Sequence, residues 1–295
     1  MEQNILSLSP SAKRWLEQSQ IARVLHVFDP VCNLINEEGD VFSLVGPFVG
    51  NGPFSALTEH GLFTSWVAAE STIELAPSFF KIDETQVSFA NARIWEPRPN
   101  WELMQKSSEH LLEASAHIET LLRKHAPLES FAHIVLPLDQ SGVAESKTFE
   151  KAGPAIDRLL PAIVDEKSDI MRASAVILGG LGPGLTPAGD DFLVGLIHAL
   201  WASRSNAAAL AMSLVMAEAA IPRTNSLSAA WLQAAAQGEA GEPWHELIAA
   251  ISVNDPNAIE RAVMRILPTG HSSGADALGG FIVLLRLLQA KGAKQ

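Results

Sequence analysis

The chain has 295 residues, of which 47% are hydrophobic and 18% are charged, so it can bury a substantial core in one large domain or two smaller ones. Its 21 basic and 33 acidic residues give a net charge of −12, which argues against a surface that binds nucleic acid or an anionic membrane. The single cysteine, Cys32, excludes an intrachain disulfide and a metal site built from several cysteines.

The start of the chain shows no secretory signal, because Met1 to Lys13 lacks a basic region followed by a long apolar stretch. No apolar run approaches the roughly 18 to 20 residues of a membrane span. We therefore expect a cytoplasmic protein that binds neither a membrane nor nucleic acid.

The first third of the chain has the pattern of short β-strands. A short helix is predicted at Ser11–Gln20. The β-type runs after it, separated by turn residues such as Asp29-Pro30 and Glu38-Gly39-Asp40, are Arg23–Phe28, Val31–Ile35, Val41–Val45, Phe54–Thr58, Leu62–Ala69 and Thr85–Trp95. We interpret residues 1–97 as a small β-rich domain that contains an antiparallel sheet or barrel.

The pattern of apolar residues changes at Glu96–Pro99, where two prolines within four residues end a strand and disfavour an immediate helix. The stretch between Ala126 and Lys151 has no clear period. Helical periodicity predicts helices at Asn100–Lys124, Pro154–Ile163, Lys167–Leu178, Asp191–Ser203, Ala207–Ala220, Ser226–Gln237, Pro243–Ile251, Pro256–Ile266 and Ala275–Leu288. The predicted fold is α+β, with the small N-terminal antiparallel β domain packed on a larger all-helical domain at residues 98–295.

A glycine-rich motif, GGLGPGLTPAGDD at residues 179–191, is the most distinctive stretch of the sequence. Glycines and proline prevent a helix or strand from continuing through it. A helix then begins, either with Thr186 as the N-cap or at Asp190 or Asp191. One interpretation is a tight turn between helices in which the aspartates only cap. The other is an anion site, because a glycine-rich loop that leads into a helix offers free N–H groups and a positive dipole end.

A second glycine-led helix start lies near the C-terminus, at residues 270–285. Without gaps, Gly189, Asp191, Leu193, Gly195 and Ile197 align with Gly274, Asp276, Leu278, Gly280 and Ile282. A glycine one turn inside a buried helix indicates close helix packing. We therefore predict that the two helices cross at these glycines and that both loops face one pocket.

Several side chains near these motifs are candidates for chemistry. Arg223 lies in a chain poor in basic residues and is suited to bind a phosphate or carboxylate, although a solvated arginine is the commoner case. Ser226 is expected to cap the next helix. His271 is either a base or donor near neutral pH or a turn residue without a role. Asp190, Asp191 and Asp276 would also suit Mg²⁺, although no other metal-ligand spacing is present.

These motifs give the chain a resemblance to a known family. The stretch Gly182–Gly195, with Arg223–Ser226 and Gly270–Asp276, resembles a bacterial family that includes the oxamate carbamoyltransferase subunit of allantoin degradation and members labelled as carboxylases. The family's first motif often reads Thr-Pro-Ser-Gly-Asp-Asp, and here Ala188 stands in place of the serine. The likeness extends over most of the chain.

The resemblance implies a purine-catabolic carbamoyl transfer between oxalurate plus phosphate and oxamate plus carbamoyl phosphate. It also implies partner subunits, one of them similar to acyl-CoA synthetases. The site would bind a small anion such as carbamoyl phosphate, phosphate or oxamate, with no certain cofactor. The expected binding residues are Gly182, Gly184, Thr186, Gly189, Arg223, Asn225, Ser273, Gly274 and Asp276, and the expected catalytic residues are Asp190, Asp191 and His271.

Two other functions remain open on the sequence alone. One is a Mg²⁺-dependent hydrolase that uses Asp190, Asp191 and Asp276 to activate water. The other is a non-catalytic subunit that holds an anion or a partner protein. Within the site, we expect Asp190 to face the ligand and Asp191 to cap the helix, because two ionised aspartates at one helix start would repel an anion.

Overall fold

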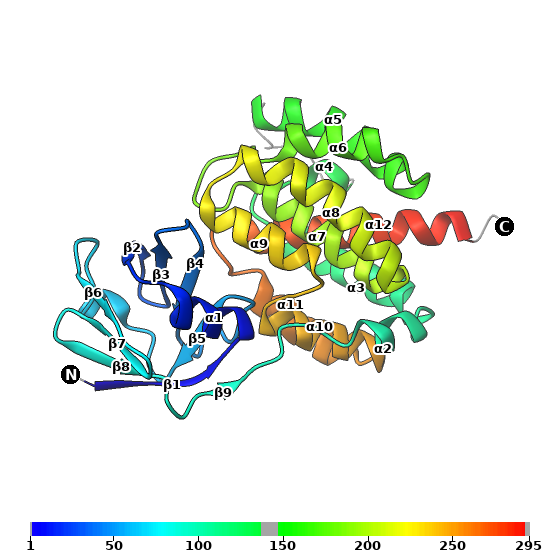
Figure 1. The fold of residues 1–295 in the computed structure, drawn as a ribbon. Coiled ribbons are helices and arrows are strands. Elements are labelled where there is room, and N and C mark those ends of the chain that lie inside the picture. Colours follow the sequence, from blue (N-terminus) through cyan, green and yellow to red (C-terminus); the bar gives the residue numbers. More distant parts are fainter. Residues whose placement is uncertain (1, 137–146, 293–295) are drawn as a thin grey trace. The chain divides into compact units, whose positions relative to one another are not determined.

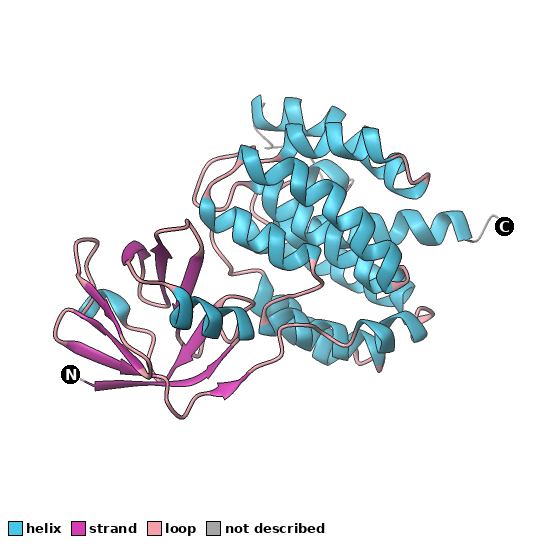
Figure 2. Cartoon of the chain, viewed as in Figure 1, coloured by secondary structure: helices cyan, strands magenta, loops and turns pink. Residues whose placement is uncertain are grey.

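The structure is a computed structural model that describes residues 2–136 and 147–292. The chain forms two compact units (Figure 1), a β unit of Met1–Pro97 with Ala240–Glu242 and a helical unit of Arg98–Glu239 with Pro243–Gln295. Strands gather in the first unit, and helices build the second (Figure 2). The fold is α+β.

The β unit contains one sheet with two short helical segments. Its strands are β1 (Glu2–Leu8), β2 (Ala22–Val27), β3 (Val31–Asn36), β4 (Val41–Val45), β5 (Ser55–Thr58), β6 (Ile73–Leu75), β7 (Phe79–Ile82), β8 (Thr85–Ser88) and β9 (Arg93–Ile94). The helical segments are α1 (Pro10–Gln18) and the 3-10 turn η1 (Phe63–Ser65). The strand order is β2-β3-β4-β5-β1-β8-β7-β6, with β9 paired to β1.

The sheet is mixed, so the prediction of an antiparallel sheet is wrong. β1 pairs in parallel with β8 and β9, and β4 pairs in parallel with β5, whereas the other pairs are antiparallel. β2 and β6, at the two ends of the order, also contact each other, so the sheet is nearly closed. Hairpin patterns predict only antiparallel partners that follow one another in the chain. Parallel partners need longer connections, which the strand patterns do not reveal.

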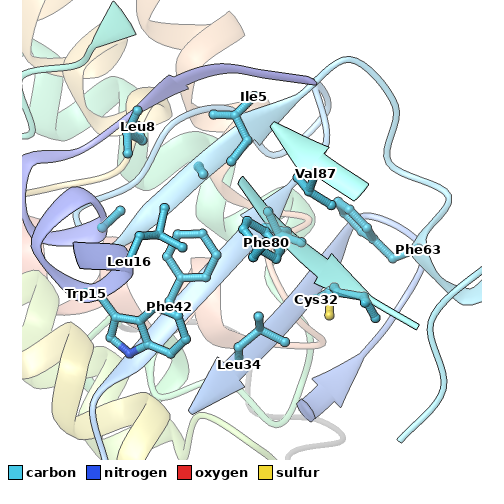
Figure 3. Close-up of a cluster of buried hydrophobic side chains, with 14 of the residues drawn as sticks. Ile5, Leu8, Trp15, Leu16, Cys32, Leu34, Phe42, Phe63, Phe80 and Val87 are labelled. Atoms are coloured by element: carbon cyan, nitrogen blue, oxygen red, sulfur yellow. The ribbon is translucent and has the colours of Figure 1, made fainter. Parts of the chain in front are cut away.

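The core of the β unit lies inside this curled sheet. Trp15 of α1 stacks on Phe42 of β4 with ring centroids 5.0 Å apart, and Phe42 meets the edge of Phe80 of β7 at 6.0 Å (Figure 3). Cys32 is fully buried beside Leu34, and burial raises the pKa of its thiol to about 12. The thiol is therefore an apolar core group that does not ionise near neutral pH.

Several details of this unit differ from the sequence prediction, which contains no strand at β6 or β7. β1 was not predicted, because the sequence EQNILSL mixes polar and apolar residues without a clear period. Leu62–Ala69 contains the turn η1 and no strand. Thr85–Trp95 forms two strands, β8 and β9, which are separated by a turn that closes with a hydrogen bond from Ala92 N to Phe89 O.

The described part of the helical unit is built from α-helices of four to 20 residues and one 3-10 turn of three residues, η2. They are α2 (Trp101–Lys106), α3 (His110–His125), α4 (Ala132–Val135), α5 (Lys147–Val164), α6 (Ser168–Leu178), α7 (Ala188–Ser203), α8 (Asn206–Ala220), η2 (Ile221–Arg223), α9 (Ser226–Ala236), α10 (Glu242–Ser252), α11 (Pro256–Ile266) and α12 (Ser273–Gly292). The helix predicted at Asn100–Lys124 is two helices, because Ser107 ends α2: its N–H and its hydroxyl donate to carbonyls of the last turn. Part of the stretch Ala126–Lys151 lies outside the described residues.

Helices α7 and α12 make the most extensive helix contact of this unit (Figure 1). Nearly every residue of α7 from Ala188 to Ala202 is buried, as is most of the first half of α12. In the described part of the chain, the segment Ser273–Ala290 of α12 is long and apolar enough to cross a membrane, with a mean hydropathy of 1.2. No segment of this kind was expected from the sequence. Within the protein 67% of Ser273–Ala290 is buried, as expected for a core helix.

Candidate functional site at the crossing of two glycine-led helices

The helices α7 and α12 cross in backbone contact at their glycines. A Cβ atom on Gly195 of α7 would lie 1.8 Å from the carbonyl oxygen of Ala277, and one on Gly280 of α12 would lie 2.2 Å from that of Phe192. Any side chain at either position would push the helices apart. The prediction of a crossing at these two glycines is confirmed.

The starts of the two helices repeat one construction. A Cβ atom on Gly189, in the first turn of α7, would lie 2.1 Å from the carbonyl oxygen of Leu178, the last residue of α6. A Cβ atom on Gly274, in the first turn of α12, would lie 2.0 Å from that of Ile266, the last residue of α11. Each helix thus begins with a glycine that packs against the end of the preceding helix.

The loop between α6 and α7 has a conformation that needs glycine. Gly180, Gly182 and Gly184 have φ angles of +69°, +125° and +98°, a region that other residues rarely adopt. A Cβ on Gly180 would also collide with the carbonyl oxygen of Arg223 at 2.2 Å, whereas one on Gly184 would meet nothing within 4 Å. The Gly180 end of the loop is therefore packed against η2, and the Gly184 end is open. Helix α7 begins at Ala188 with Pro187 as N-cap, so none of the predicted caps is used.

Asp190 is buried and holds this loop in place. Its Oδ1 accepts a hydrogen bond from Gly180 N at 2.9 Å, and its Oδ2 accepts one from Thr224 Oγ1 at 2.5 Å. Burial raises the pKa of its carboxyl, and the hydrogen bonds from Thr224 and Gly180 oppose that effect. Both oxygens of Asp190 are occupied by protein donors. This geometry is the reverse of the expectation that Asp190 faces a ligand.

Asp191 lies where the two helix starts meet. The hydroxyl groups of Thr186, before α7, and Ser273, at the start of α12, are 2.7 Å apart and hydrogen-bonded to each other. Burial raises the pKa of the Asp191 carboxyl well above its usual value. The nearby hydroxyl groups of Ser273 and Thr186 lower it, and the charges of Asp276 and Asp190 raise it further. Asp191 Oδ2 is enclosed and has no hydrogen-bond partner, although the residue as a whole keeps some exposed area.

Asp276 is the third carboxyl group of the junction and is 0% exposed. Its Oδ1 accepts a hydrogen bond of 2.6 Å from the backbone N–H of Phe131, and its Oδ2 has no partner. Burial raises its pKa to about 6, against the lowering effect of Ser130, Phe131, Ser272 and the charge of His271. Asp276 therefore ties the segment before α4 to the start of α12.

The predicted residues Asn225 and Arg223 are exposed. Asn225 caps α9 in place of the predicted Ser226, since its Oδ1 accepts from Leu227 N at 3.0 Å and Ser228 N at 3.1 Å. Its Nδ2 donates to Leu185 O at 2.9 Å and so also fixes the glycine-rich loop. Arg223 is exposed at the end of η2, beside that loop.

His271 is exposed, and its Nε2 lies 3.6 Å from Glu129 Oε2, an ion-pair contact between solvated side chains. In the described residues, no group of three or more His, Cys, Asp or Glu side chains is arranged to hold a metal ion. The donor set explains this result, because Asp190 and Asp276 use carboxylate oxygens to accept protein hydrogen bonds. A Mg²⁺ site formed by Asp190, Asp191 and Asp276 together is not present among the described residues.

Sequence reasoning missed several residues of the site, among them Ser130, Phe131 and Thr224. Thr224 follows Arg223 directly, and a hydroxyl residue beside a candidate arginine is the signal that could have indicated it. No signal marks Ser130 and Phe131, because Phe131 lies 145 positions away from Asp276 in sequence.

The fold and site define an α+β protein with a glycine-led pair of crossing helices, two buried aspartates and a third that is partly buried, and no solved structure matches it. Residues 178–285 match the family described as oxamate carbamoyltransferase subunit AllH. The match runs from the last residue of α6 into α12, so it covers both glycine motifs and η2. The family resemblance drawn from those motifs is confirmed.

Proposed function

We propose that this chain is a subunit of an oxamate carbamoyltransferase and that the junction of α7 and α12 binds the small anionic substrates. One observation carries the proposal. The matched residues 178–285 contain two glycine motifs separated by about 80 residues, and a hydrogen bond between Thr186 and Ser273 joins them at the start of both helices.

The chemistry of the junction suits phosphate, carbamoyl phosphate and oxamate. Gly182 and Gly184 have backbone N–H groups that donate to no acceptor within the described residues. Such groups beside a helix start attract anions, and they can stabilise the oxyanion that forms when a carbamoyl carbon is attacked. Arg223 adds an exposed positive charge beside the loop. Because the chain is acidic overall, these local donors must supply the attraction.

The family is named for a subunit, so the transfer reaction belongs to an assembly. We propose that the other subunits include one similar to acyl-CoA synthetases, and that the isolated chain binds the anion but does not turn it over. A subunit that only holds an anion or a partner would bind in the same way and contribute nothing to transfer. A test with the assembly is therefore required.

The experiment has a binding arm and an activity arm. Calorimetry would measure phosphate, carbamoyl phosphate and oxamate binding to the isolated chain, with and without Mg²⁺. We expect roughly millimolar affinity that does not depend on Mg²⁺, and a loss of about tenfold or more in Arg223→Ala, since a charge-assisted hydrogen bond contributes about 1.5–3 kcal/mol. Arg158→Ala, an exposed arginine of α5, is the matched control.

The activity arm would follow carbamoyl phosphate formation from oxalurate and phosphate by the chain together with its partner subunits. Omission of this chain should abolish the reaction. If all ligands bind Arg223→Ala as well as wild type, the anion site lies elsewhere. If the other subunits catalyse the transfer without this chain, the proposed function is wrong.

A further inference from the structure

Asn225 joins the start of α9 to the far end of the glycine-rich loop through one side chain. Its Oδ1 accepts from the backbone N–H groups of Leu227 at 3.0 Å and Ser228 at 3.1 Å. Its Nδ2 donates to the carbonyl oxygen of Leu185 at 2.9 Å. The oxygen and the nitrogen of the amide group are therefore both bonded to backbone, and one orientation of the side chain serves the helix and the loop together.

The bond to Leu185 also determines where the next backbone donor points. The peptide group between Leu185 and Thr186 is planar and trans, so the N–H of Thr186 points opposite to the carbonyl that faces Asn225. In the described residues this N–H donates to no acceptor. Pro187 restricts the backbone of Thr186, because Thr186 directly precedes the proline ring. Asn225 and Pro187 thus hold an unpaired N–H group in a fixed direction.

The near end of the loop is held by the residue that precedes Asn225. Thr224 Oγ1 donates to Asp190 Oδ2 at 2.5 Å, and Oδ1 of the same carboxyl group accepts from Gly180 N at 2.9 Å. Two neighbouring residues at the start of α9 therefore restrain both ends of the stretch 180–185. The loop and α9 are held together at two points.

The middle of the loop depends on these restraints. Gly182 and Gly184 have positive φ angles, and their N–H groups donate to no acceptor within the described residues. Glycine loses more conformational freedom than any other residue when it is fixed. If the loop became ordered only on binding, the entropy lost at that moment would weaken the affinity. Ends that are already fixed reduce the number of conformations that the free loop can adopt.

We propose that Asn225 is a positioning residue of the anion site. Its bond to the loop gives the unpaired N–H groups their binding directions before the anion arrives. Those N–H groups belong to Gly182, Gly184 and Thr186. The inference rests on the proposed function and assigns to Asn225 no contact with the substrate. Loss of the bond to the loop should weaken the binding of every anion that these donors hold.

The variant Asn225→Ser separates the two tasks of this side chain. Serine caps a helix about as well as asparagine, but it has no amide group to donate to the loop. NMR order parameters of the isolated chain should lie near about 0.85 at Gly184 and Thr186 in wild type and below about 0.6 in the variant. Asn100→Ser is the matched control, because Asn100 caps α2 by accepting from Leu103 N at 3.0 Å. A loop that is already flexible in wild type, or equally ordered in Asn225→Ser, overturns the inference.

Calorimetry with phosphate tests whether the held loop matters for binding. One lost hydrogen bond corresponds to roughly two- to tenfold in affinity, so phosphate should bind Asn225→Ser more weakly by that factor. Asn100→Ser should bind phosphate as wild type does. Chemical denaturation should show similar stability of the two variants, since each keeps its helix cap. A fall in affinity without a fall in stability is therefore the result expected of a positioning residue.

Kinetics of the assembled enzyme give a second readout. The phosphate KM of Asn225→Ser should rise by the same factor while kcat changes by less than about twofold, because the loop is held alike before and during the reaction. A residue that only caps α9 would leave KM unchanged. Equal phosphate affinity in Asn225→Ser and wild type overturns the positioning role and leaves the proposed function intact. If wild type binds no phosphate, the anion site of the proposed function fails, and this role fails with it.

Discussion

Gly195 of α7 lies so close to Ala277 of α12 that a Cβ atom on the glycine would stand 1.8 Å from the alanine carbonyl oxygen. On the other side of the crossing, Gly280 approaches the carbonyl oxygen of Phe192 in the same manner. The two helices therefore meet backbone to backbone. This contact brings Asp191 and Asp276, each about one turn before its helix's glycine, into electrostatic reach of each other.

Alanine at either crossing glycine should destabilise the protein. In Gly195→Ala the new methyl group meets a backbone atom that cannot rotate away, so the helices must separate. We expect the free energy of unfolding to fall by about 1–3 kcal/mol or more, as in other overpacked cores. Chemical denaturation followed by circular dichroism would measure the change.

The matched control is Gly153→Ala in α5, where a Cβ atom would meet nothing within 4 Å. Its free energy of unfolding should stay within about 1 kcal/mol of wild type, since alanine favours a helix over glycine by about that amount. Equal losses in both variants would mean that the glycines at the crossing are not required for close packing.

The crossing could be predicted from the sequence because its cause is periodic. Glycines at matching positions in two otherwise apolar helices can be recognised in the amino-acid sequence, because close helix packing is what requires a glycine there. The mixed sheet could not be predicted in this way. β1 pairs in parallel with β8 and β9, residues that lie about 80 positions further along the chain, and no local pattern encodes such partners.

Asp190 should act as a structural clamp for the glycine-rich loop. Asp190→Ala removes the acceptor for Gly180 N and Thr224 Oγ1, and hydrogen bonds to a charged group contribute about 1.5–3 kcal/mol. A double-mutant cycle with Thr224→Val should give a coupling free energy of about 0.5–3 kcal/mol, measured by denaturation. Losses that simply add would show that the Thr224 contact contributes nothing.

The different roles of adjacent aspartates were beyond sequence reasoning. Asp190 and Asp191 are both good capping residues, and which one meets a ligand depends on the direction in which each points. For Asp190 that direction is set by Thr224 and Gly180, which lie 34 and 10 positions away in the chain. The sequence thus indicated the residues of the junction, whereas the contacts that orient the Asp190 carboxyl group come from positions that the motif does not contain or mark.

Asp276 should make the protein less stable as the pH rises. Its folded pKa of about 6 lies above the ordinary value of 3.8, so between these values the folded state holds a proton that the unfolded state has lost. The contribution of Asp276 to stability is present below about pH 4 and is lost as the pH rises through 6, a change on the order of 3 kcal/mol. Asp276→Asn should remove this part of the pH dependence.

Free energies of unfolding measured between about pH 4 and 7 would test this prediction, with Asp157→Asn as a control for the loss of one exposed charge. As the pH rises, the free energy of unfolding of wild type should fall relative to that of Asp276→Asn. A constant difference across the range would show that Asp276 does not titrate in this window.

His198 should have the opposite effect and weaken the protein in acid. It is buried in α7, where its ring lies 4.7 Å from Trp244 and 6.0 Å from Trp101, and its Nδ1 has no hydrogen-bond partner. Burial lowers its pKa from 6.5 to about 4, with a smaller opposing effect of the hydrogen bond to Glu239 O. Between pH 6.5 and about 4, His198 binds a proton in the unfolded chain but not in the folded protein. Stability is therefore lost as the pH falls from about 6.5 to 4, by an amount on the order of 3 kcal/mol.

His198→Phe tests this directly, because phenylalanine keeps an aromatic ring between the tryptophans and cannot bind a proton. At pH 7 the variant loses only the weak contact from His198 Nε2 to Glu239 O, which is 3.4 Å long. As the pH falls to about 5, wild type should lose about 2 kcal/mol more than the variant, measured by urea denaturation at each pH. The variant should then be the more acid-resistant protein. If the free energy of unfolding falls equally in the two proteins between pH 7 and 5, His198 is protonated in the folded state and its aromatic surroundings do not exclude the charge.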